Sequence, residues 1–144
     1  MKGESKFHSK KITLPTGEVF DSKLEYERWN FLKAMILAGK VKDLERQVTY
    51  VLLPKQTKSS QPIGKNGTLL KPKVRVVERE CTYKADFVYK ALVDPVFNIW
   101  ATIVEDTKGF KTPEYRLKKK MMLYFHAVEI QEIKKAIQPI KTSV

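Results

Sequence analysis

The stretch VFNIWATIVEDTKG, residues 96–109, decides the fold of this chain. Residues 96–104 form its most apolar strand-like run, and charged residues then end that run abruptly. Side chains alternate along a strand, so Asp106 and Lys108 are expected on one face and Glu105 on the other. The pattern predicts a buried strand whose end carries an acid, one spacer and a lysine.

A second acid, Asp86, lies in the β-rich run 74–89 that precedes this strand. Asp94-Pro95 predicts a turn between the two runs. Neighbouring strands lie about 4.8 Å apart, so a hairpin would bring Asp86 and Asp106 close together. The residues alone leave a plainer alternative open, in which Asp86 is solvated and Asp106 forms a surface ion pair with Lys108.

The other elements follow from turn, cap and periodicity signals. We expect a hairpin over 12–20, a helix from Ser22 to Gly39, a strand over 48–53, a long loop or hairpin tip over 55–73, a helix from Thr112, and a short strand around Val128 and Ile130. The stripes expected to be buried are Leu24, Trp29, Phe31, Leu32, Met35 and Ile36 on the first helix, and Leu117, Met121, Tyr124 and Phe125 on the second.

The order helix, three strands, helix and strand predicts an α/β fold with a mixed sheet and a helix on either side. A length of 144 residues is enough for one domain with its own core. We expect a basic N-terminal arm over residues 1–11, a single domain over 12–133 and a loose tail over 134–144.

Composition narrows the class of protein. No apolar run approaches the roughly 20 residues of a membrane helix, and the first ten residues lack the apolar block of a secretory signal. One cysteine and two histidines exclude a cysteine-based zinc site and disfavour a histidine-rich one. A cytoplasmic protein without a membrane partner is expected.

The net charge of +12 points to a polyanionic partner, mainly nucleic acid. Lysines cluster in the N-terminal arm, in the loop 55–73 and on the second helix. We expect DNA contacts from Lys10 and Lys11 in the arm and from Lys118 and Lys119 on the helix. A lysine-rich solvated surface is the alternative.

Glu25 has two possible roles at the start of the first helix. The Ser22 to Glu25 spacing is that of a capping box, which alone accounts for a glutamate there. Glu25 also shares a helical face with Trp29 and Leu32, so its carboxylate is expected to look towards the sheet. Arg28 is then either a partner of Glu25 or a contact to a DNA phosphate.

Asp86, Asp106 and Glu25 are the candidate ligands of a divalent cation. Magnesium prefers oxygen ligands, and a cation held by carboxylates stabilises a scissile phosphate and activates water. Lys108 would orient or deprotonate that water, or neutralise charge on the phosphate. Gln47, at the beginning of a strand, is either a positioning residue or an ordinary polar strand end.

In their order, these motifs resemble those of the PD-(D/E)XK nuclease superfamily. The matching elements are Glu25, Asp86 and the segment Asp106-Thr107-Lys108, with Ala85 in place of the proline of the family name. The chain is most similar to small phage-encoded, Holliday-junction-resolvase-like endonucleases, through segments 7–11, 20–25, 44–47, 85–87 and 104–109.

The resemblance implies a restriction-endonuclease-like αβββαβ core and dependence on Mg²⁺ or Mn²⁺. It also implies cleavage of branched DNA, most of all four-way junctions, by a homodimer with Glu25, Asp86, Asp106 and Lys108 as catalytic residues. Two other functions stay open: a nuclease for flaps, mismatches or duplex DNA, and a non-catalytic nucleic-acid-binding module. A bulge at the strand end would make Glu105 a ligand in place of Asp106.

Overall fold

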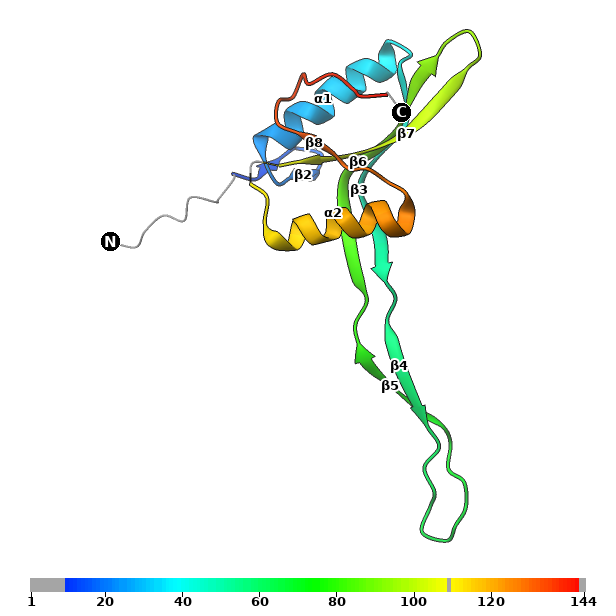
Figure 1. The fold of residues 1–144 in the computed structure, drawn as a ribbon. Coiled ribbons are helices and arrows are strands. Elements are labelled where there is room, and N and C mark those ends of the chain that lie inside the picture. The colour runs from blue at the N-terminus through cyan, green and yellow to red at the C-terminus, as the bar shows by residue number, and fades with distance from the viewer. Residues whose placement is uncertain (1–9, 109, 143–144) are drawn as a thin grey trace, which may run out of the picture.

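The computed structural model describes residues 10–108 and 110–142 and shows a mixed α/β fold (Figure 1). The central sheet has the order β3 (Val41–Leu53), β6 (Cys81–Asp94), β7 (Ile99–Thr107) and β8 (Gln131–Ile133). The first three strands are antiparallel, and β8 runs parallel to β7. The predicted order of helix, three strands, helix and strand is confirmed.

The two helices, α1 (Lys23–Leu37) and α2 (Pro113–His126), cover opposite faces of this sheet. Ile103 of β7 packs in a core cluster with Leu32 of α1, whereas the next residue, Val104, packs with Met122 of α2. Because adjacent residues of a strand point to opposite faces, the helices lie on either side of β7. Figure 1 shows them above and below the sheet.

The buried side chains of β6 change sides at Asp86. Tyr83 and Ala85 belong to the core under α2, whereas Phe87 and Tyr89 belong to the core under α1. Regular alternation would keep all four odd-numbered residues on one face, so the strand is irregular here. Asp86 therefore lies where the two halves of the core meet.

Helix α1 begins as predicted, since the Ser22 hydroxyl accepts a hydrogen bond from the Glu25 backbone N–H at 3.1 Å. A short hairpin precedes it, formed by β1 (Ile12–Thr13) and β2 (Val19–Phe20). Leu32 of the expected stripe is fully buried, but Ile36 is exposed. The centre of the buried face is occupied instead by the charged residue Arg28.

Helix α2 has the expected Thr112 cap and Pro113 start, but of its predicted buried stripe only Met121 packs against the core. Leu117, Tyr124 and Phe125 are exposed, and the helix buries Tyr115 and Met122. These two residues are seven apart and so share a face. Lys118 and Lys119 lie between them, and such side chains can cover apolar surface with their stems while their ammonium groups reach solvent.

Of the two alternatives for residues 55–73, a long loop or a hairpin tip, the structure shows the hairpin. Strand β4 (Gln56–Ser60) pairs with β5 (Lys73–Glu78) in a separate two-stranded sheet. This ribbon continues the β3–β6 hairpin outward and protrudes from the body (Figure 1). Strand β3 also begins at Val41, seven residues before the predicted start at 48, because the segment after α1 pairs directly with β6.

The C-terminal segment differs from the loose tail that the sequence predicts. The segment 134–142 is not a loose tail: the carbonyl oxygens of Ala136 and Gln138 accept hydrogen bonds from Arg28 Nη1, and Ile140 packs against the core under α1. Most of the predicted basic arm, residues 1–9, lies outside the described residues. Lys10 and Lys11 are exposed, and Lys11 Nζ lies 3.7 Å from Asp21 Oδ1.

Candidate functional site

A cavity of about 270 Å³ opens where α1, β6 and the end of β7 meet. It is lined by Asp21, Ser22, Leu24, Glu25, Asp86, Thr107 and Lys108. Three of the four residues predicted to be catalytic therefore line one cavity, although they come from three separate elements. The fourth, Asp106, is 2% exposed and borders the cavity through its ion pair with Lys108.

Asp86 is the central carboxylate of this cavity. Its Oδ2 accepts hydrogen bonds from the backbone N–H of Thr107 at 2.8 Å and from the Thr107 hydroxyl at 2.7 Å. Its Oδ1 accepts one from Gln47 Nε2 at 3.3 Å. The hairpin pairing that was expected between the two acidic strands is present, with Phe87 opposite Glu105.

Glu25 is buried although it lies in the first turn of α1. Its Oε2 accepts from the Asp21 backbone N–H at 2.9 Å, and its Oε1 accepts from Gln47 Nε2 at 2.8 Å. Burial, and next the negative charge of Asp86, raise the pKa of the Glu25 carboxyl above its ordinary value. The glutamate thus points towards the sheet, as its position on the helix predicts, and its carboxylate lies close enough to Asp86 to be affected by that negative charge.

Gln47 joins these two carboxylates. Its side-chain amide donates to both Glu25 and Asp86, and its backbone has a φ of 54°, a left-handed conformation that costs a non-glycine residue energy. Strain of this kind persists where the surroundings impose it, and it gathers at functional sites. Of the two roles left open by the sequence, positioning of the site is the one that this geometry supports.

Replacement of Gln47 by alanine is expected to lower the rate of the site's reaction by roughly 10- to 100-fold, as loss of an outer hydrogen bond to metal-binding carboxylates does. The matched control is Asn30→Ala on α1, an exposed amide side chain outside the cavity. The measurement is turnover of each variant against wild type at matched folding. A Gln47→Ala variant as active as Asn30→Ala would contradict this role.

Asp106 is the most perturbed carboxylate of the site. Its Oδ2 accepts a hydrogen bond from the Tyr83 hydroxyl at 2.5 Å, and its Oδ1 is buried and accepts no hydrogen bond from the described residues. Burial, followed by the negative charge of Asp86, raises the pKa of the Asp106 carboxyl to about 6. The Oδ1 oxygen instead faces a cation, because the Lys108 ammonium lies 3.2 Å from it.

Lys108 brings the positive charge of the site. Its Nζ lies 3.2 Å from Asp106 Oδ1 and 4.6 Å from the centre of the Tyr115 ring, so an ion pair and a cation–π contact hold it. The side chain is 30% exposed and lines the cavity. The ammonium group is thus fixed beside Asp106 and accessible to a ligand.

Glu105 is hydrogen-bonded to residues outside the cavity, which favours Asp106 over Glu105 as the second acidic metal ligand. The Arg28 guanidinium donates to it twice, from Nε at 2.8 Å and from Nη2 at 2.5 Å, and the Tyr89 hydroxyl donates as well. Both Glu105 and Arg28 have no exposed surface. The expectation that Arg28 contacts DNA or Glu25 is therefore wrong: it is a buried partner of Glu105.

The lysines predicted to bind DNA from α2 already have acidic partners. Lys118 pairs with Glu114 at 3.0 Å, and Lys119 pairs with Glu132, which also holds Lys111 at 2.7 Å. Burial alone would raise the pKa of Glu132, but Lys111 and Lys119 outweigh burial and hold that pKa below its ordinary value.

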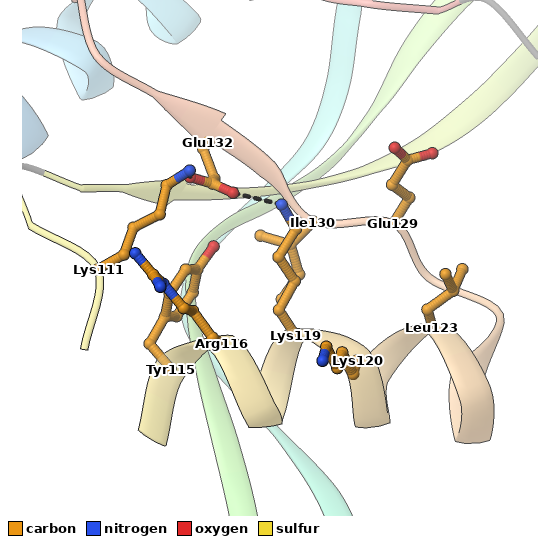
Figure 2. A pocket seen from close by; sticks show the side chains of 9 residues that line it. All are labelled: Lys111, Tyr115, Arg116, Lys119, Lys120, Leu123, Glu129, Ile130 and Glu132. Atoms are coloured by element: carbon orange, nitrogen blue, oxygen red, sulfur yellow. Dashed lines mark hydrogen bonds and ion pairs between the residues drawn. The ribbon is translucent and has the colours of Figure 1, made fainter. Parts of the chain in front are cut away.

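A second cavity, of about 450 Å³, lies between α2 and β8 and is lined in part by Lys111, Lys119 and Glu132. Figure 2 shows Lys111 and Lys119 pointing at Glu132, whereas Arg116 and Lys120 lie along α2. No ion pair among the described residues includes Arg116 or Lys120. These two are the cations of this cavity that remain available to a phosphate, and the lysine cluster on the helix was the signal for them.

Thr107 and Tyr83 are the site residues that the sequence did not reveal. Thr107 was considered only as the spacer between Asp106 and Lys108, yet its backbone and hydroxyl both hold Asp86. Tyr83 was considered only as a strand residue, yet its hydroxyl holds Asp106. Burial, and next the charge of Asp106, raise the pKa of Tyr83, which keeps the hydroxyl protonated as a donor.

The donor set suits a magnesium ion better than a zinc ion. Within residues 10–108 and 110–142, no group of three His, Cys, Asp or Glu side chains is already assembled as a metal centre. Magnesium requires less than this, because it binds through one or two carboxylates and completes its shell with water and substrate phosphate. Asp86 and Asp106 together meet that requirement, since each places a carboxylate close enough to feel the charge of the other.

The chain belongs to a family described as "Protein of unknown function (DUF1064)", whose model matches residues 4–141. No curated protein and no solved structure matches the chain. In the part of the chain that the structure describes, no helix is long and apolar enough to cross a membrane.

Proposed function

We propose that this member of the DUF1064 family is a metal-dependent DNA endonuclease that cuts branched DNA, most of all four-way junctions. The observation that carries the proposal is the convergence of Glu25, Asp86 and Lys108 on one cavity, with Asp106 paired to that lysine. Glu25, Asp86 and Asp106 are the metal ligands that the sequence predicts, and Lys108 is the predicted catalytic lysine. The net charge of +12 fits a nucleic-acid substrate.

In this proposal Asp86 and Asp106 hold Mg²⁺ or Mn²⁺, and Glu25 supports them as a further ligand or through water. The bound cation would supply Lewis-acid stabilisation of the phosphate and a water of lowered pKa. Gln47 and Thr107 fix the direction of the Asp86 oxygens. These hydrogen bonds hold the negative charge of Asp86 in place near that of Asp106. Tyr83 does the same for Asp106.

Lys108 acts on the substrate from the same side as Asp106. Its ammonium, held over the Tyr115 ring, is placed to neutralise the charge that develops on the phosphate or to orient the attacking water. Its ion pair with the Asp106 carboxylate favours the role of phosphate contact over that of general base.

The homodimer is part of the proposal, because two symmetric cuts in a junction require two sites. Light scattering is expected to give twice the 16.7 kDa mass of one chain. A cytoplasmic setting, where such DNA is formed and thiols such as that of Cys81 stay reduced, belongs to the same proposal.

The pKa of Asp106 predicts how metal and pH affect stability. Because the folded-state pKa is raised to about 6, the folded protein binds a proton there between about pH 4 and 6 that the unfolded chain has lost. In EDTA, wild type should therefore lose stability relative to Asp106→Asn as pH rises from about 4 to 7, by roughly 2–3 kcal/mol.

Thermal unfolding of both proteins across this pH range measures the effect. At the alkaline end, added Mg²⁺ should raise the melting temperature of wild type and not of Asp106→Asn, since only the native wild type binds it. Parallel pH profiles for the two proteins would contradict the buried, ionisable role of Asp106.

The substrate is tested by cleavage of a labelled four-way junction beside a linear duplex of the same arm sequences, with Mg²⁺. Symmetric cutting of the junction with the duplex left intact is expected. Equal cutting of both would keep the nuclease and move the proposal to its alternative, a nuclease of flaps, mismatches or duplex DNA.

A further inference from the structure

The β4–β5 ribbon has no visible role in the proposed chemistry. It lies outside both core clusters, and every residue of the two strands is exposed. An isolated two-stranded ribbon is at best marginally stable in water. A projecting ribbon of this length is more readily explained by a partner than by the fold.

The register of the ribbon separates its side chains into two different faces. Residues paired across an antiparallel ladder share a face, and neighbours along a strand do not. Lys58 pairs with Arg75 and Ser60 pairs with Lys73, which gives one face three cations. Thr57 pairs with Val76 and Ser59 with Val74, so the other face carries no charge.

The positive charges of the cationic face are not balanced by nearby acidic residues of the ribbon. Residues 54–80 contain seven Lys or Arg and two Glu, an excess of five positive charges. Lys58 and Arg75 lie directly opposite each other, an arrangement that disfavours pairing unless an anion lies between them. None of the ion pairs found within residues 10–108 and 110–142 includes Lys58, Lys73 or Arg75.

The dimensions of the ribbon suit a DNA groove. Strand β4 has five residues, which at about 3.3 Å per residue span roughly 17 Å, about half a turn of duplex. The major groove of B-DNA admits a two-stranded ribbon. A phosphate backbone would also supply the anions that the facing cations lack.

We propose that the β4–β5 ribbon is a DNA-binding arm that contacts the backbone of one duplex arm through the face formed by Lys58, Lys73 and Arg75. The choice of DNA as partner rests on the proposed function. The contact itself requires no cleavage. The arm positions DNA by its phosphates and contributes no base readout from these three side chains.

Two double variants with equal change of net charge test the face. Lys58→Ser with Arg75→Thr removes two charges from the cationic face. Thr57→Glu with Val74→Glu also lowers the net charge by two, but on the neutral face and at positions that are not paired with each other. Affinity for a labelled four-way junction is measured in Ca²⁺ over a range of salt concentrations, with circular dichroism as the folding check.

The first variant is expected to bind roughly tenfold more weakly and to lose about two from the slope of log affinity against log salt. The second should stay within about threefold of wild type and keep its slope. Equal weakening by both, or no weakening by the first, would overturn the proposal. If DNA binding depends on the ribbon but the protein cuts no DNA, only the proposed nuclease activity is overturned. If the protein cuts DNA but its binding does not depend on the ribbon, only the proposed DNA-binding arm is overturned.

Discussion

Asp86→Asn is expected to lower the single-turnover rate of DNA cleavage by about 10³-fold, equivalent to roughly 4 kcal/mol of lost transition-state stabilisation. Asp86 is the carboxylate that Gln47 and Thr107 both hold, and its charge raises the pKa of Glu25 and of Asp106. Asparagine keeps an oxygen that accepts from Thr107, so the local structure should persist while the negative charge is lost.

The matched control for this prediction is Asp94→Asn, at the other end of the same strand. Asp94 is half-buried like Asp86, and its Oδ1 accepts from the backbone N–H groups of Val96 and Phe97 in the β6–β7 turn. Wild-type cleavage is expected for Asp94→Asn. An Asp86→Asn protein that keeps a tenth or more of wild-type activity would remove Asp86 from the reaction.

Arg28→Met is expected to cost about 3–5 kcal/mol of folding free energy, the typical penalty for removing one partner of a buried ion pair. The substitution leaves the Glu105 carboxylate buried with only Tyr89 as donor, and it releases the carbonyl oxygens of Ala136 and Gln138. In a chain of this size the melting temperature should fall by roughly 10 °C.

A second substitution separates charge from packing in this cluster. Adding Glu105→Gln to Arg28→Met removes the unpaired charge and should recover about 1–3 kcal/mol of the loss. Arg116→Met, on the exposed side of α2, is the control and should change stability by less than about 0.5 kcal/mol. Additive losses in the double variant would show that Arg28 acts through packing and not through Glu105.

The fold was largely predictable because its determinants are local. Ser22 and Thr112 each cap a helix through their hydroxyl groups, and Asp94-Pro95 closes the hairpin that aligns the acidic strands. Alternation along β7 correctly separated Glu105 from Asp106. Each of these features depends on residues a few positions apart, so a sequence pattern suffices to find it.

What the sequence could not show depends on contacts between distant residues. From the sequence Arg28 was a partner of Glu25 or a DNA phosphate contact, yet a carboxylate 77 positions away and carbonyl groups more than 100 positions away make its burial possible. The apolar stripe of α2 was assigned to the wrong face because Leu117 and Tyr124 fit helical spacing as well as Tyr115 and Met122 do. Only the packing of the sheet distinguishes the two faces.

The charged residues of the candidate site were predictable from the sequence, but the residues that hold them by hydrogen bonds were not. Glu25, Asp86 and Lys108 stand out as charges within or beside apolar patterns, and they line one cavity. The amide of Gln47 and the hydroxyls of Tyr83 and Thr107 belong to residue types that occur in any strand. Their role follows from where β3, β6 and β7 place them, which a single sequence does not encode in a recognisable motif.

The most direct measurement is cleavage of a labelled four-way junction in Mn²⁺, by wild type and by Asp106→Asn purified in parallel, with binding of the same DNA measured in Ca²⁺. Both proteins should bind the junction in Ca²⁺, and wild type alone should cut it in Mn²⁺. Equal cutting by both would remove Asp106 and its metal site from the reaction. Tight binding by both with cutting by neither would identify a nucleic-acid-binding module and contradict the nuclease.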